Sequence, residues 1–328
     1  MKRLGVNLLL VVGLVVAVAA AVTLGEVGLS GAQYLQALTH PAEPAGQILW
    51  DIRTPRVFAA AAVGACLGLS GALLQGLLRN PLADPGVLGV SACAGLGASL
   101  AIVLGLAVTP GAVEGAALAG AGVAAVALVI FAARFAEPEA LILFGVSLSA
   151  FAGALTALVF NFSPSPIATA EVLGWMLGSV ENREWSDAGW GALALVAAGA
   201  LGLWARKGLL VLTLGEETAA TTGLPIRWLK IAAVVAAAIA TGAAVAIAGV
   251  VGFVGLAAPH LVRAAVREDP AKLLLPSTLA GALMLVVADL IARTLPTDIE
   301  VKLGVLTALI GAPLFGLIAW RAARSWRS

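Results

Sequence analysis

The sequence is poor in the residue types that carry most enzymatic and metal chemistry. Its 328 residues include two cysteines, two histidines and one tyrosine, and only 11% of them are charged. Both cysteines, Cys66 and Cys93, lie in long apolar segments, which indicates packing and not a disulfide or a metal ligand. The two histidines, His40 and His260, are far apart in the chain. We therefore expect no catalytic residue and no metal site.

Two further absences exclude whole classes of function. The formal net charge is +1, so the chain has no basic excess for a nucleic-acid partner. The sequence also contains no GxxxxGK[ST] phosphate-binding loop and no long polar region for a soluble domain. The chain is therefore not expected to hydrolyse ATP or to bind a cofactor of its own.

What the sequence has in excess is apolar surface. Hydrophobic residues make up 61% of the chain, far more than a water-soluble domain can bury, so membrane lipid is the expected surrounding. The apolar runs are long and do not alternate with polar residues, which excludes a transmembrane barrel. The expected fold class is an all-α membrane protein, because backbone groups in lipid must be satisfied internally.

Charged and turn-forming residues divide the chain into ten predicted spans. Their approximate limits are 4–24, 56–78, 87–107, 115–133, 140–160, 189–206, 230–250, 254–266, 273–293 and 304–322. The eighth is short for a bilayer. A further short helix, at or dipping into the membrane, is expected around 170–178, between the fifth and sixth spans. The whole chain, 1–328, is expected to form one membrane domain.

The distribution of Lys and Arg predicts the orientation. Most of the 19 basic residues fall in one alternating set of loops together with both termini, so both termini are predicted to be cytoplasmic. A fixed offset along the chain aligns Gly64 and Gly71 with Gly242 and Gly249, and the spans involved would run in opposite directions. This is either an inverted repeat, as many transporters have, or a chance match in a glycine-rich chain.

The second predicted span carries small residues and one amide in its apolar interior. Gly64, Gly68 and Gly71 share a face, and Gln75 follows one turn later. Small residues let helix backbones approach closely in lipid, where no hydrophobic force drives association. A buried amide in a span usually has a partner or a function. We expect these four residues to serve packing or to line a pathway.

Seven segments together resemble the permease family of ABC importers for iron-siderophores, haem and cobalamin, the FecCD/BtuC type. They are RTPR (53–56), SGALLQ (70–75), RNPLADP (79–85), LGEETA (214–219), GFVGLAAPHLVR (252–263), ADLIAR (288–293) and GVLTALIGAP (304–313). They occur in the family's order over nearly the whole chain. The resemblance implies an inverted-repeat permease fold, a homodimer with a central pathway, and transport by alternating access in the cytoplasmic (inner) membrane of a bacterium.

The resemblance also assigns roles at the outer face. Arg53, Arg56 and Arg293 lie on the side that is poor in positive charge. In the family, arginines at these positions receive carboxylates from the two lobes of a periplasmic or extracellular substrate-binding protein, a task that suits the guanidinium fork. The alternative is local pairing, of Asp51 with Arg53 or of Asp289 with Arg293.

On the inner face the resemblance assigns a gate and a coupling element. Asn80 and Leu82 would help to form the cytoplasmic gate. The connection at about 206–230 would contact a separate ATP-binding cassette subunit, present in two copies, which uses ATP and Mg. The coupling residues expected there are Leu214, Gly215, Glu216, Glu217, Thr218, Ala219 and Gly223. Glu216 and Glu217 would occupy the first turn of a short helix that Gly223 terminates.

Two other functions remain possible from the sequence. A secondary transporter driven by an ion gradient would need charged groups near mid-membrane, and a membrane enzyme would need a nucleophile and a base; the sequence favours neither. Among the family's substrates, iron chelates are the default only because they are the commonest. Lys302 departs from the family pattern, which has a proline there, and it is expected either to contact the binding protein or to be exposed.

Overall fold

The fold is built from helices and their connecting turns. The computed structural model describes residues 2–25, 27–135, 137–266, 269–296 and 300–325, and no β-strand occurs within these ranges. In chain order the helices are α1 (Lys2–Thr23), α2 (Gly31–Thr39), α3 (Pro44–Gln47), the π-helix η1 (Ile48–Arg53), α4 (Thr54–Leu77), the 3-10 helix η2 (Pro85–Leu88), α5 (Val90–Val103), the 3-10 helix η3 (Leu106–Val108), α6 (Ala112–Arg134), α7 (Pro138–Asn161), α8 (Pro166–Met176), α9 (Trp185–Leu212), α10 (Glu216–Ala220), α11 (Ile226–Ala248), α12 (Val254–Arg263), the 3-10 helix η4 (Ala264–Val266), α13 (Pro270–Thr294) and α14 (Leu303–Ser325).

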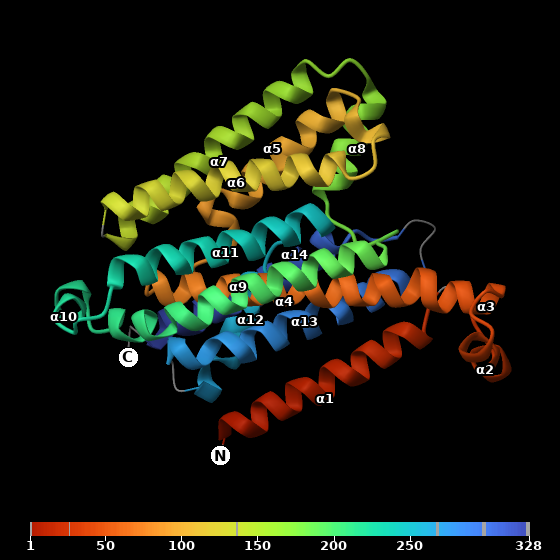
Figure 1. Ribbon diagram of the computed structural model, residues 1–328, viewed down its shortest axis with the longest axis horizontal. Coiled ribbons are helices and arrows are strands. Elements are labelled where there is room, and N and C mark those ends of the chain that lie inside the picture. Colours follow the sequence, from red (N-terminus) through yellow and green to blue (C-terminus); the bar gives the residue numbers. More distant parts are fainter. Residues whose placement is uncertain (1, 26, 136, 267–268, 297–299, 326–328) are drawn as a thin grey trace.

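The predicted spans all correspond to helices. Seven helical segments of the described chain are long and apolar enough to cross a membrane, and three shorter apolar helices, in α5, α12 with η4, and α14, take the remaining positions. Figure 1 shows α4, α9, α11, α12 and α13 at the centre, with α1 on one side and α5 to α8 on the other. Helices α2 and α3 lie at one end of this bundle, and α10 lies at the opposite end.

Helix α4 is the central element, and its glycines explain how. It packs against α9, α11, α12 and α13. A Cβ atom would lie 2.3 Å from the carbonyl oxygen of Gly281 if placed on Gly64, and 2.2 Å from that of Ser277 if placed on Gly68. On Gly71 it would lie 1.8 Å from the carbonyl oxygen of Gly255. Any side chain at these positions would push α13 or α12 away from α4.

Helices α4 and α11 run in opposite directions through the bundle (Figure 1) and pack against each other. An inverted repeat requires this arrangement of the second and seventh spans. Ser70 of α4 and Thr241 of α11 join the two helices, since their hydroxyl oxygens are 2.7 Å apart and the Ser70 hydroxyl also donates to the carbonyl oxygen of Ala237 at 3.1 Å. A buried polar pair of this kind holds the two helices in register.

Two short helices differ from their predicted limits. The helix expected around 170–178 begins earlier, at Pro166, because the Ser165 side chain accepts the N–H of Ile167 and caps its start. The predicted stop of the inner connection at Gly223 is wrong. Helix α10 already ends at Ala220, and Gly223 forms the turn beyond it with φ of 75°. A single turn of helix is too short to reach that glycine.

Candidate functional site

A cluster of charged side chains joins α4, α13 and the segment before α14 at the α2/α3 end of the bundle. The Arg56 Nε and Nη2 atoms both donate to Oδ1 of Asp289, at 3.0 and 2.8 Å. Its Nη1 donates to Oε2 of Glu300 at 3.0 Å, and its Nη2 also donates to Oε1 of Glu300. One guanidinium therefore serves two carboxylates, each through two hydrogen bonds.

The other two arginines of this region also point into the protein. Arg293 Nε lies 3.5 Å from Oδ2 of Asp289, so the predicted i, i+4 pair is present, and Nη2 of Arg293 donates to the carbonyl oxygen of Ala21 in α1. Arg53 is 4% exposed. It donates to the carbonyl oxygens of Val22, Thr23 and Val27 and to the Tyr34 hydroxyl. The alternative pairing of Arg53 with Asp51 is not among the ion pairs of the described residues.

The balance of charge in this cluster is positive. The guanidinium of Arg293 lies within electrostatic reach of those of Arg53 and Arg56 and of the carboxylates of Asp289 and Glu300. Asp289 and Arg293 are buried, and the side chains of Arg56 and Glu300 are each 11% exposed. The five side chains therefore carry a formal net charge of +1, and Arg56 and Glu300 are the two of them that reach the surface.

The segment that holds Glu300 is attached at a second point. Lys302 Nζ lies 3.0 Å from Oε2 of Glu181, so Lys302 is paired within the chain. The N–H groups of Leu303 and Gly304 donate to the carbonyl oxygens of Gly178 and Leu177, at 2.9 and 3.0 Å. The start of α14 is thereby tied to the turn that follows α8.

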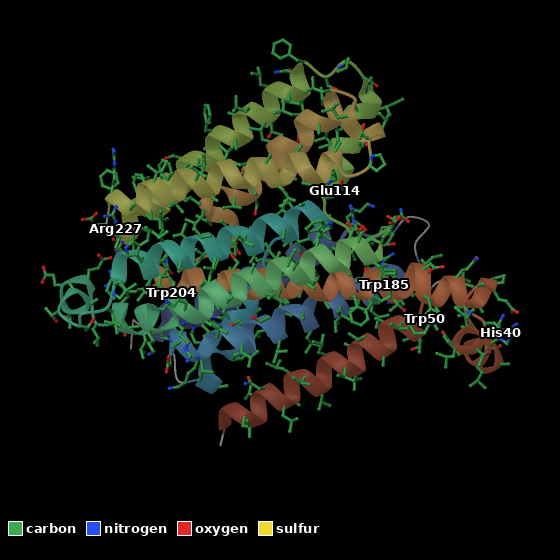
Figure 2. The ribbon with its side chains drawn as sticks, in the orientation of Figure 1. His40, Trp50, Glu114, Trp185, Trp204 and Arg227 are labelled. Atoms are coloured by element: carbon green, nitrogen blue, oxygen red, sulfur yellow. The ribbon has the colours of Figure 1, made fainter. Side chains whose placement is uncertain are left out.

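Tryptophans line the same end of the bundle. Figure 2 shows Trp50 and Trp185 beside one another, where η1 meets the start of α9. The indole N–H of Trp185 donates to the carbonyl oxygen of Trp50 at 3.0 Å. The indole N–H of Trp50 in turn donates to the carbonyl oxygen of Ala37 in α2. The rings thus tie α2 and η1 to the transmembrane helices, as aromatic residues at a membrane interface often do.

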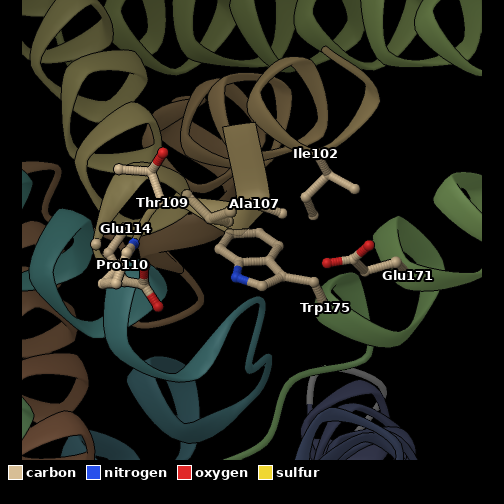
Figure 3. Close-up of a pocket in the computed structure, with 9 residues that line it drawn as sticks. Ile102, Ala107, Thr109, Pro110, Glu114, Glu171 and Trp175 are labelled. Atoms are coloured by element: carbon tan, nitrogen blue, oxygen red, sulfur yellow. The ribbon is translucent and has the colours of Figure 1, made fainter. Parts of the chain in front are cut away.

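A cavity of about 290 Å³ lies between the α5–α6 connection and α8 at this end. Figure 3 shows the Trp175 indole at its centre, with Glu171 on one side and Glu114 and Pro110 on the other. Glu114 is paired with Arg183 at 2.9 Å, whereas Glu171 is exposed. Our sequence prediction missed this cavity, because its walls come from separate segments that no single motif joins.

At the opposite end, Gln75 links α4 to α12. It is 3% exposed. Its Nε2 donates to the carbonyl oxygens of Ala83 and Leu256, both at 3.4 Å, and its Oε1 accepts from Nη2 of Arg263. A cavity of about 290 Å³ adjoins these groups and is lined by Gln75, Gly76, Arg79, Pro81, Thr213, Arg263 and Pro270. The Gln75 side chain is therefore buried between α4, α12 and the turn after α4, at the edge of this cavity.

The predicted gate residues lie in the turn that follows α4. Asn80 Oδ1 accepts the N–H of Leu82 at 2.9 Å, which shapes the turn, while the Leu82 side chain is 59% exposed. Asp84 Oδ1 accepts the N–H of Gly86 at 2.7 Å and caps η2. Burial raises the pKa of the Asp84 carboxyl above its ordinary value, and the hydrogen bond from Gly86 opposes this shift.

The predicted coupling residues lie in α10 and in the turns on either side of it. Leu214 is 64% exposed, and Glu217, Thr218 and Gly223 are also exposed, whereas Ala219 is buried. Gly215 precedes α10 with φ of 94°, and Glu216 in the first turn forms an ion pair with Lys230 of α11. Because α10 projects from one end of the bundle (Figure 1), its exposed residues are accessible to another subunit. Among the described residues, no three His, Cys, Asp or Glu side chains are grouped as metal ligands.

Comparison with known proteins agrees with this architecture. The chain is 40% identical over 271 residues to the vitamin B12 import system permease protein BtuC of Citrobacter koseri, covering 81% of each chain. It is 39% identical to BtuC of Salmonella typhimurium, covering 84% of each, and 39% identical to the ABC transporter permease protein YvrB of Bacillus subtilis, an uncharacterised protein, covering 86% of this chain and 81% of that one.

Solved structures extend the likeness to three dimensions. A metal-chelate type ABC transporter in an inward-facing conformation superposes with a TM-score of 0.85 and 29% identity, covering 97% of this chain and 99% of the other. The sequence model of the FecCD transport family matches residues 13–321. A match of this extent, on helices that follow the same path, shows that the chain belongs to the FecCD transport family and is a multi-pass permease subunit of the ABC importer type.

Proposed function

We propose that this permease imports a cobalamin-type substrate. The observation that carries the proposal is the likeness to permeases named for vitamin B12 import, which extends over most of both chains at about 40% identity. This likeness moves cobalamin ahead of the iron chelates that the sequence favoured by default. Haem and ferric siderophores are the alternatives that a transport assay must include.

The proposed assembly has two copies of this chain, two copies of an ABC ATPase and one outer binding protein. A homodimer would provide the central pathway. The exposed residues around α10, Leu214 and Glu217 among them, would contact the ATPase, so α10 would lie in the cytoplasm together with both termini. The opposite end, with α2 and α3, would then face outward. The surplus positive charge of the Arg53, Arg56, Arg293, Asp289 and Glu300 cluster supports docking of an acidic partner there.

In this mechanism the chain makes and breaks no covalent bond. The loaded binding protein docks at the charged cluster, and ATP binding and hydrolysis in the partner subunits move α10. That movement is transmitted to the turn carrying Asn80 and Leu82, which opens or closes the inner end of the pathway. Gly64, Gly68 and Gly71 let α4 pack closely against α12 and α13, so we expect these helices to move as one body.

Purification and reconstitution test the proposal. The tagged chain is isolated from its native membrane, and proteins that co-purify are identified by mass spectrometry; an ABC ATPase and a substrate-binding protein are the expected partners. The complex is then placed in vesicles, and uptake of labelled cyanocobalamin, haem and a ferric siderophore is measured with and without ATP. We expect ATP-dependent uptake of cyanocobalamin. Uptake by this chain alone under a proton or sodium gradient would instead show a secondary transporter.

A further inference from the structure

The guanidinium of Arg56 is already occupied in this structure. Four hydrogen bonds bind it to Asp289 and Glu300, and its side chain is only 11% exposed. A carboxylate from another protein could therefore not form a two-pronged pair with Arg56 while both internal carboxylates stay in place. If Arg56 docks an acidic partner, one of the two must leave.

The two internal carboxylates differ in how firmly they are held. Asp289 lies within α13, is fully buried, and also faces Arg293 at 3.5 Å. Glu300 lies outside any helix, near the surface, and its ion pair is with Arg56 alone among the described residues. Moving Glu300 requires a change in a connecting segment, whereas moving Asp289 requires a shift of a packed helix.

We propose that Glu300 is an exchangeable carboxylate, which occupies Arg56 until a carboxylate of the outer binding protein takes its place. This inference rests on the proposed function, because it names how that docking surface becomes available. The exchange replaces one carboxylate by another on the same donors, so Arg56 is never left buried and unpaired, which would be the costly state. Competition by Glu300 lowers the apparent affinity for the partner.

The exchange also changes how the start of α14 is attached. With Glu300 on Arg56, the segment from Glu300 to Gly304 is attached to α4 at one end and to the turn after α8 at the other. Release of Glu300 removes the first attachment and leaves the second. Docking is thereby linked to the position of the segment that leads into α14.

Binding measurements on four variants test the exchange. The complete transporter in lipid nanodiscs is titrated with the substrate-binding protein that co-purifies with it. Glu300→Gln keeps an oxygen acceptor but loses the charge, so we expect binding roughly three- to tenfold tighter than in the parent, as release of a competitor predicts. Glu171→Gln is the matched control, because it removes an exposed carboxylate at the same end of the bundle that takes no part in the ion pairs of the described residues, and it should leave the affinity within about twofold.

The variants Arg56→Gln and Arg56→Gln with Glu300→Gln complete the set. Both should bind weakly and equally, because Glu300 competes only through Arg56. If Arg56→Gln binds as tightly as the parent, the docking role fails and the exchange fails with it. If Arg56→Gln weakens binding but Glu300→Gln does not tighten it, the docking role stands and the exchange alone is overturned.

A second measurement needs no partner protein. The transporter is treated with p-hydroxyphenylglyoxal, which reacts with accessible arginines, and modification at each site is followed by peptide mass spectrometry. We expect Arg56 to react faster in Glu300→Gln than in the parent, while Arg53 and Arg293 react at unchanged rates. Equal rates at Arg56 would contradict the exchange, and a uniform increase at all three would show local unfolding and likewise contradict it.

Discussion

Arg56 and Asp289 are 233 residues apart in the sequence, yet Nε and Nη2 of Arg56 both donate to one carboxylate oxygen of Asp289. This pair joins the start of α4 to the last third of α13, beside the glycine contacts that let the same two helices approach closely. Backbone packing and charge pairing thus act on the same α4–α13 interface.

Asp289→Asn should strongly destabilise the protein. The asparagine leaves Arg56 with Glu300 alone and leaves the buried Arg293 without its carboxylate, and loss of one partner from a buried ion pair costs about 3–5 kcal/mol. The midpoint of thermal unfolding in lipid nanodiscs measures the effect. Glu181→Gln, in a partly exposed pair with Lys302, should change the free energy of unfolding by less than about 1 kcal/mol. Equal effects of the two changes would contradict this account.

Gly71→Ala should loosen the centre of the bundle. The added methyl group would lie 1.8 Å from the carbonyl oxygen of Gly255, a rigid backbone atom, so α12 must move away from α4. Overpacking of this kind costs about 1–3 kcal/mol or more. Gly122→Ala in α6 is the matched control, since no atom lies within 4 Å of a Cβ at that position. The two variants are compared by thermal unfolding, and Gly71→Ala should unfold at the lower temperature.

The helices and their order along the chain could be predicted from the sequence, but the contacts between distant segments could not. Long apolar runs bounded by charged residues predict helices. Lipid offers no hydrogen-bond partners, and an α-helix satisfies its backbone N–H and C=O groups within its own segment. The pairs of Arg56 with Glu300 and of Gln75 with Arg263 depend on how helices pack, and a single sequence does not show that. The pair of Asp289 with Arg293 was predictable, since an i, i+4 spacing places both on one helix face.

The same reasoning explains why the arginines of the docking prediction were placed at a surface. Charge distribution indicates which end of a span an arginine occupies, but not whether its side chain turns outward or inward. Arg53 turns inward because the carbonyl groups at the end of α1 lie within its reach. Its docking role stays a prediction, and among the three arginines of that prediction Arg56 is the most exposed.

Gln75→Leu should destabilise the protein by about 1–3 kcal/mol, although leucine matches its apolar surroundings. The change removes the oxygen that accepts from Arg263 and both amide contacts, to Ala83 and Leu256, and it leaves buried polar groups without these partners. Gln75→Glu keeps the acceptor and should be tolerated better, because Arg263 supplies the opposite charge. Thermal unfolding of both variants measures the difference. If the leucine variant is the more stable of the two, Gln75 is dispensable for packing.

The pKa of Asp84 predicts a pH dependence at the turn after α4. Burial raises this pKa in the folded protein above its unfolded value, so the folded state binds the proton more tightly. The resulting stability is present at a pH below the unfolded pKa and is lost as the pH rises through the folded pKa. Asp84→Asn keeps an acceptor for the N–H of Gly86 and carries no charge. Its thermal midpoint should therefore exceed that of the parent at neutral pH, and the gap should narrow towards pH 4. If the difference between the two thermal midpoints does not change with pH, ionisation of Asp84 does not cause it.

Gly215→Ala should reduce coupling without weakening the bundle. Gly215 has φ of 94° and ψ of 158°, a region open almost only to glycine, and no atom lies within 4 Å of a Cβ there. An alanine held in this conformation would strain the backbone by about 1–3 kcal/mol. Because nothing surrounds the site, the exposed connection can relieve that strain by changing the direction in which α10 starts. We expect fewer substrate molecules imported per ATP hydrolysed in the reconstituted complex, at an unchanged temperature of unfolding. Gly28→Ala, also in open space but at the opposite end of the bundle, is the control and should import as the parent does. If Gly215→Ala keeps the parental ratio of import to hydrolysis, the direction of α10 does not transmit the work of the ATPase.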